Sequence, residues 1–162
     1  MMEELLASAD RVGALLKARG ETIAVAESST GGLISAALLS VGGASAYYVG
    51  GAVVYTKTSR AALLGITPAD MAGIRPSTEA YASLLAERTR SRHGTIWGIA
   101  ETGATGPVGN GYGDAAGHCC IGLAGPRPAA LTLETGHGDR RLNMRTFAVR
   151  ALRLIEDELS GV

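Results

Sequence analysis

Apolar residues recur at helical spacing near both ends of the chain and form short continuous runs between them. Leu5, Ala9, Val12 and Leu16 fall on one face of a helix, so their spacing predicts a first helix from about Glu3 to Arg19. A glycine follows this segment, as is common at the end of a helix. The short apolar runs bounded by turn residues are instead typical of buried strands.

The same reading divides the rest of the chain into alternating strands and helices. Strands are expected at 22–26, 47–55, 95–101, 118–123 and 129–134, and helices at 33–39, 58–64, 68–72, 78–92 (capped by Ser77 or Thr78) and from 139 onward. This alternation predicts an α/β fold, a three-layer α/β/α sandwich over a mostly parallel (mixed) sheet. The last two strands are close enough in sequence for an antiparallel hairpin. We expect one domain over residues 1–162.

Composition and charge narrow the class of protein. The chain is 46% hydrophobic and 19% charged, which favours a folded core over disorder. Fifteen basic residues balance fifteen acidic ones, so direct nucleic-acid binding is not expected. The start is acidic and unlike a signal peptide, and glycine pairs interrupt the uncharged stretch 28–55, which argues against a membrane span. A cytoplasmic protein is expected; a homo-oligomer such as a dimer is left open.

The first candidate for chemistry is Glu27-Ser28-Ser29-Thr30-Gly31-Gly32, which follows a predicted strand and opens a helix. Ligands of α/β proteins bind at the carboxyl ends of strands, and a helix N-terminus there offers free amides to a phosphate or an oxyanion. The hydroxyls offer a nucleophile or phosphate contacts. The alternative is that Ser29 or Thr30 only caps the helix.

Two further candidates also follow strands. Residues 55–60 carry Tyr55, Lys57 and Arg60, and a tyrosine with a lysine can activate a serine without histidine; the alternative is a solvated turn. The third candidate, at the end of another strand, is Glu101-Thr102-Gly103-Ala104-Thr105-Gly106-Pro107. A Gly-rich loop from Gly103 to Gly117 either closes over a ligand or is a surface connection.

Five arginines on the last helix form mostly a solvated face, and one or two near its start are candidates for pairing with a phosphate. They are Arg140, Arg141, Arg145, Arg150 and Arg153. The three histidines lie in unrelated contexts, so the sequence predicts neither a metal site nor a histidine-based triad.

Several of these segments, in this order, resemble the CinA C-terminal-domain family. Residues 26–32 read A-E-S-S-T-G-G where the family has A-E-S-C-T-G-G, so Ser29 stands in place of a cysteine. Further matches lie at 42–48, 51–60, 64–66, 103–107 and 138–140, with Arg145 after them. Full-length family members carry another domain before this one, so the resemblance implies the stand-alone form.

The resemblance implies an amidohydrolase that needs no cofactor and converts nicotinamide mononucleotide and water to nicotinate mononucleotide and ammonia. It implies Ser28 as the nucleophile and Tyr55 in the activating position, but the family's lysine base aligns with Arg60, which cannot accept a proton near neutral pH. Lys57, one helical turn earlier, is the alternative base. A diverged nucleotide-binding protein without deamidase activity is the alternative function.

For such a reaction, the amides near Gly31 and Gly32 are expected to stabilise the oxyanion. Arg145 and the turn Gly103–Gly106 are expected to hold the phosphate.

Overall fold

A computed structural model describes residues 2–161. The elements follow one another as α1 (Met2–Arg19), β1 (Ile23–Glu27), α2 (Leu33–Leu39), η1 (Ala44–Ala46), β2 (Tyr48–Val53), α3 (Lys57–Leu64), α4 (Glu79–His93), β3 (Trp97–Ala104), β4 (His118–Ala124), β5 (Ala129–Glu134) and α5 (Arg140–Ser160). No helix within residues 2–161 is both long enough and apolar enough to cross a membrane.

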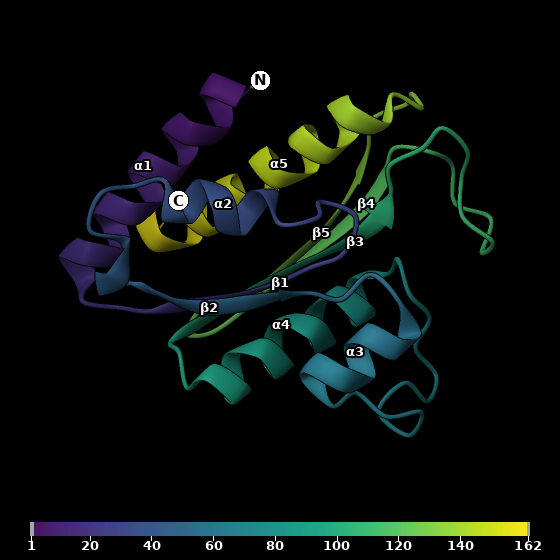
Figure 1. The fold of residues 1–162 in the computed structure, drawn as a ribbon, viewed down its shortest axis with the longest axis horizontal. Coiled ribbons are helices and arrows are strands. Elements are labelled where there is room, and N and C mark those ends of the chain that lie inside the picture. The colour runs from purple at the N-terminus through teal and green to yellow at the C-terminus, as the bar shows by residue number, and fades with distance from the viewer. Residues whose placement is uncertain (1, 162) are drawn as a thin grey trace.

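The five strands form one mixed sheet in the order β2-β1-β3-β4-β5. β1 pairs in parallel with both β2 and β3, whereas β4 is antiparallel to β3 and to β5. Four of the five strands therefore run in the same direction. The sheet lies between α1, α2 and α5 on one face and α3 and α4 on the other (Figure 1), which confirms the predicted three-layer α/β/α sandwich.

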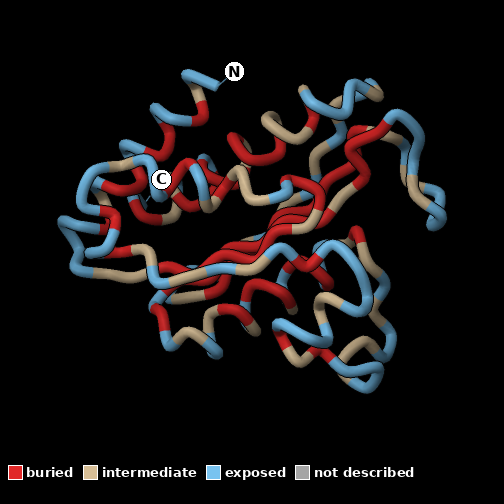
Figure 2. The backbone as a smooth tube through the Cα atoms, viewed as in Figure 1, coloured by how far each residue is buried: buried red, intermediate tan, exposed pale blue. Residues whose placement is uncertain are grey.

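The core has two parts because successive strand residues point to opposite faces of the sheet. Ile99 packs with Leu16 and Phe147 in the larger cluster, under α1, α2 and α5. The next residue, Ala100, packs with Leu85 in the smaller cluster, under α3 and α4. β1 and β4 are buried along their whole length and β3 everywhere except at Gly103, as the red tube of Figure 2 shows.

Two glycines let α4 lie close against the sheet. A Cβ atom on Gly98 would lie 2.2 Å from the carbonyl oxygen of Ala86, and one on Gly122 would lie 2.6 Å from the carbonyl carbon of Ala82. Any larger residue at these two positions would push α4 away from the sheet. This close approach fixes the start of α4, which borders the candidate site.

One expected helix does not form, and one expected strand is longer than predicted. Residues 68–73 form turns and no helix, because Gly73 adopts a left-handed conformation with φ 74° directly after the first turn. The third strand continues beyond 101 to Ala104, because β4 pairs with it up to the contact between Ala104 and His118. Gly103 and Ala104 are therefore strand residues, and the Gly-rich loop starts at Thr105.

Candidate active site

The carboxyl ends of the parallel strands β1, β2 and β3 meet at one edge of the sheet, where ligand sites of α/β proteins lie. Ser28 follows β1, Tyr55 follows β2 and Gly103 lies near the end of β3. All three line one cavity of about 360 Å³. A second hollow of about 340 Å³ shares Tyr55 and Gly103 with it and is also lined by Thr105 and Arg140. Together they form a continuous site at the predicted edge.

Two fully buried carboxylates, Glu27 and Glu101, accept hydrogen bonds from the loop that carries Ser28. Glu101 accepts hydrogen bonds from the amides of Ser28 and Thr30, both at 3.0 Å, and from the hydroxyl of Ser29. The Thr30 hydroxyl lies 2.8 Å from an oxygen of each carboxylate. Burial raises the pKa of Glu101, and the hydrogen bonds from Ser29, Thr30 and Ser28 oppose that rise without cancelling it.

The side chain of Ser29 serves as a hydrogen-bond donor to Glu101. A hydroxyl is a stronger hydrogen-bond donor than a thiol, and a buried carboxylate needs donors. Glu101 opens the third candidate segment of the sequence, but nothing in the sequence connects it with the loop of Ser28. Its only signal is a charged residue at the end of an apolar strand.

Four residues proposed to contact substrate have other partners in this structure. Ser29 and Thr30 are buried and their hydroxyls are used by Glu101 and Glu27. The Gly32 amide donates to Glu27 at 3.1 Å, and the Gly31 amide donates to the Ser28 carbonyl at 3.2 Å. These groups therefore shape the loop and are not free for the ligand contacts that the sequence suggested.

The start of α3 brings cationic groups to the cavity. Thr56 caps this helix, and Lys57 and Arg60, one turn apart, both line the cavity. The guanidinium of Arg60 donates to the Tyr81 hydroxyl at 3.4 Å and lies 5.4 Å from the centre of its ring. Burial raises the pKa of Tyr81 against the opposing effect of Arg60, so this phenol keeps its proton at neutral pH.

The arginine that reaches the site is Arg140 and not Arg145. Arg140 stands at the first position of α5 and donates to the Gly106 carbonyl and, at 3.3 Å, to the Tyr55 hydroxyl. Arg145 lines a separate hollow with Leu33. The two arginines are five positions apart, so they point in different directions around the helix. The expectation that Arg145 lies beside the Gly103–Gly106 turn was therefore wrong.

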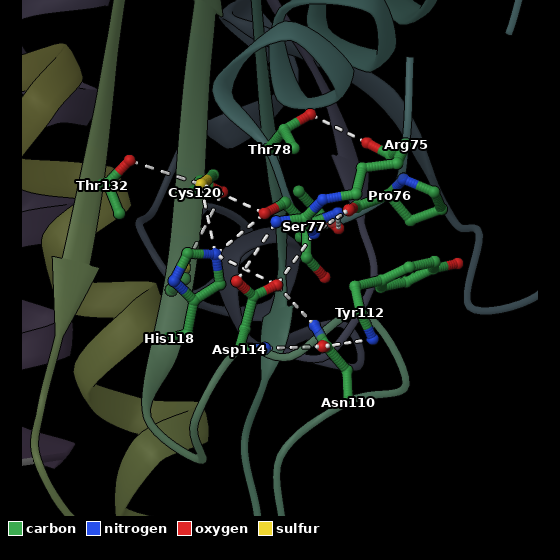
Figure 3. Close-up of polar contacts among 12 residues, drawn as sticks. Arg75, Pro76, Ser77, Thr78, Asn110, Tyr112, Asp114, His118, Cys120 and Thr132 are labelled. Carbon is green, nitrogen blue, oxygen red and sulfur yellow. Dashed lines mark hydrogen bonds and ion pairs between the residues drawn. The ribbon is translucent and has the colours of Figure 1, made fainter. Parts of the chain in front are cut away.

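One wall of the cavity is formed by residues 76–77, which the sequence does not indicate, and by the Gly-rich loop, for which contact with a ligand is one of two alternatives. Asn110 and Tyr112 of that loop line the cavity. The loop is held in place by Arg75, which donates to the Asp114 carboxylate at 2.9 and 3.2 Å and stacks over Tyr112, 5.3 Å from the ring centre. Figure 3 shows Asp114 between Arg75 and Asn110. The Gly-rich loop is thus tied to residue 75 and forms a wall of the cavity.

Ser77 belongs to the same wall and has an uncommon backbone. Its φ of 61° makes it the one non-glycine residue with positive φ among residues 2–161. This left-handed conformation costs an L-residue about 1 kcal/mol. The sequence suggests Ser77 only as one of two candidate caps of the helix, but Thr78 is the residue that caps α4.

Known proteins resemble this chain in sequence and in structure. A family model described as CinA C-terminal domain matches residues 6–159. A CinA-like protein from Synechocystis sp. is 42% identical over 139 residues, which are 86% of this chain and 33% of that protein. A CinA-like protein from Anaeromyxobacter dehalogenans is 37% identical over 146 residues, 90% of this chain and 36% of that protein. The chain thus spans about a third of these relatives' length.

Solved structures share the fold. A competence-damaged protein (CinA) superfamily protein from Klebsiella pneumoniae superposes with a TM-score of 0.90 at 23% identity, over 98% of this chain and 99% of that one. The competence/damage inducible protein CihA from Agrobacterium tumefaciens gives a TM-score of 0.86 at 24% identity, over 97% and 96% of the chains. On the match of the family model and the sequence relatives, this chain belongs to the CinA C-terminal domain family.

Proposed function

We propose that this protein is an amidohydrolase that converts nicotinamide mononucleotide and water to nicotinate mononucleotide and ammonia. The observation that carries the proposal is the place of Ser28. It follows a central parallel strand, lines a cavity of about 360 Å³, and its hydroxyl donates to no protein group within residues 2–161. Family membership supports a hydrolase of this class.

The two joined hollows suit the two ends of a mononucleotide. Tyr81 and Tyr112 line the cavity that contains Ser28, and aromatic rings favour contact with a pyridine ring. Arg140 and the backbone of Gly103–Gly106 line the other hollow, where a guanidinium favours a phosphate. Each hollow lies at about the lower end of the volumes usual for small-molecule sites. This orientation would place the carboxamide near Ser28.

In the proposed reaction the Ser28 oxygen attacks the carboxamide carbon. The base passes the serine proton to the nitrogen, the carbon–nitrogen bond breaks, and the nitrogen leaves as ammonia. Water then hydrolyses the acyl-serine to the carboxylate and restores the serine hydroxyl. The Ser29 amide is suited to stabilise the oxyanion, because it follows the nucleophile and has no acceptor within residues 2–161, whereas its neighbours are bonded. Arg60 supplies positive charge only, and Lys57 is the proposed proton acceptor.

The second candidate function is a nucleotide-binding protein that has lost catalysis. It is favoured by one observation: the position of the family's lysine base is occupied by Arg60, which is engaged with Tyr81. An arginine in that place keeps the charge of the site and removes the proton acceptor.

The test of the reaction is ammonia release from nicotinamide mononucleotide by the purified protein. Ser28→Ala should abolish release while mononucleotide binding, measured by calorimetry, stays within about twofold of wild type. Ser45→Ala, an exposed serine before β2, should leave both unchanged. A Ser28→Ala protein that still turns over would remove Ser28 from the mechanism.

The choice of base is tested on the two lysines of the chain. Lys57→Ala should lower kcat by about a hundredfold or more, as expected for the loss of a general base, with little change in binding. Lys17→Ala is the matched control, since Lys17 lies on α1 and bonds the carbonyl of Gly42. If the wild-type protein binds the mononucleotide without hydrolysing it and Arg60→Lys gains turnover, the non-catalytic function is the correct one.

A further inference from the structure

Ser77 is held in its left-handed conformation from two sides. Its amide donates to the Thr102 hydroxyl at 3.2 Å, from β3, and its carbonyl accepts from Nε2 of His118 at 2.8 Å, from β4. Figure 3 shows His118 and Cys120 beside Ser77. Both backbone polar groups of a buried residue are thus bonded to the sheet.

The contacts of His118 suit a protonated imidazole, which donates a hydrogen bond to the Ser77 carbonyl. Its Nδ1 faces the Glu134 carboxylate from β5, and its Nε2 faces the Ser77 carbonyl and, at 3.7 Å, Asp114 of the Gly-rich loop. Each nitrogen meets an acceptor, and a neutral imidazole donates from only one nitrogen, so the imidazolium satisfies both. The other ionisable neighbours are Cys120 on the same strand, and Arg75, which pairs with Asp114.

Within residues 2–161, the Ser77 hydroxyl makes no hydrogen bond that would stabilise the fold. Thr78 caps α4, and within residues 2–161 the Ser77 hydroxyl has no protein hydrogen-bond partner. Ser77 is 5% exposed, yet no fully buried side-chain oxygen or nitrogen in this range lacks a partner, so this hydroxyl opens into the cavity that Ser77 lines. Glycine would adopt the same backbone without cost. A strained residue with a free polar group is characteristic of a functional site.

We propose that Ser77 binds the carboxamide end of the substrate through its hydroxyl, with His118 as the residue that positions it. This inference rests on the proposed function. Ser77 lines the cavity of Ser28 and is absent from the lining of the hollow that contains Arg140, so its partner is the pyridine carboxamide rather than the phosphate. A hydroxyl both donates to an amide carbonyl and accepts from an amide nitrogen.

Two substitutions separate the hydroxyl from the backbone. Ser77→Ala and Ser77→Gly both remove the hydroxyl, but only glycine relieves the left-handed strain. Both should raise the KM for nicotinamide mononucleotide, and its Kd measured by calorimetry, by about fivefold, the effect of one lost hydrogen bond. Ser77→Gly should also raise Tm relative to Ser77→Ala. Ser83→Ala, an exposed serine on α4, the helix that follows Ser77, is the control.

The outcomes distinguish the proposal from the reaction on which it rests. If Ser77→Gly binds like wild type and Ser77→Ala does not, only the backbone matters and the proposal is wrong; it is equally wrong if neither variant changes affinity. If the wild-type protein binds the mononucleotide but releases no ammonia, the deamidase function fails, and the Kd series still decides the role of Ser77. A protein that does not bind the mononucleotide overturns both.

Discussion

A single buried carboxylate, Glu101, organises the loop of the proposed nucleophile. It receives donors from three consecutive residues, Ser28 to Thr30, that lie more than seventy positions away in the sequence. The Thr30 hydroxyl lies 2.8 Å from an oxygen of Glu27 and 2.8 Å from an oxygen of Glu101. It stands between the two carboxylates and can donate its one proton to either of them. The direction of the Ser28 side chain therefore depends on an acid that never meets the cavity.

Glu101→Gln should damage both stability and activity. The substituted amide turns an NH₂ group toward backbone amides or hydroxyls that need an acceptor, and a buried unsatisfied group costs about 2 kcal/mol. We expect the free energy of unfolding, measured in urea, to fall by about this amount and kcat to fall about tenfold or more. Glu3→Gln, on the exposed face of α1, should change neither. Wild-type stability and kcat in Glu101→Gln would show that the loop does not depend on this carboxylate.

At the scale of elements, several residues of the candidate site lie at or just before the N-termini of helices. α3 begins at Lys57, α4 begins two residues after Ser77, and α5 begins with Arg140. The unpaired amides of a helix start favour nearby negative charge, which suits a phosphorylated ligand. The start of α5 is held beside the Gly-rich loop by Asn143, whose side-chain amide donates to the Thr105 carbonyl at 2.9 Å.

This arrangement predicts that Arg140 binds the phosphate. Arg140→Ala should raise the KM for nicotinamide mononucleotide about tenfold or more, because a charge-assisted hydrogen bond is lost. The same variant should act on nicotinamide riboside, which lacks the phosphate, with little change in KM. Arg145→Ala is the matched control on the same helix and should behave like wild type with both compounds. An equal loss with both compounds would show that Arg140 supports the loop and does not bind the phosphate.

At the scale of the molecule, His118 joins parts of the chain that are distant in sequence. From β4 it reaches Glu134 on β5, the Ser77 carbonyl before α4 and Asp114 in the Gly-rich loop. Burial by itself lowers the pKa of His118. The hydrogen bonds to Glu134 and Ser77 and the charges of Glu134 and Asp114 outweigh burial and raise that pKa above its ordinary value.

A raised histidine pKa gives a pH dependence of definite sign. The folded state binds the proton more tightly than the unfolded state, so the stabilisation is fully present below the ordinary histidine pKa of about 6.5. It is lost as the pH rises through the higher pKa of the folded state. The difference in unfolding free energy between wild type and His118→Gln should therefore be largest near about pH 6 and shrink toward about pH 9. Ser45→Ala, which replaces an exposed residue without an ionisable side chain, should show no such trend. A constant difference across this range would contradict a charged His118.

The sequence alone predicted most elements and the edge of the sheet that holds the site. The observed bounds of α1 and α2 agree with the predicted ones to within one residue. An amphipathic helix can be predicted locally, because its buried residues are three or four positions apart. Ser28, Tyr55 and Gly103 meet because parallel strands end at a common edge, a rule of topology that the order of elements already contains.

Tertiary structure decided which further side chains line the cavity and which support its loops. Glu101 was hidden inside an apolar strand, Arg140 rather than Arg145 was brought to Tyr55, and Ser77 was bent into a left-handed turn by Thr102 and His118. Each of these contacts joins residues at least 25 positions apart. Local sequence patterns do not predict such long-range contacts, because the contacts depend on how the helices pack against the whole sheet.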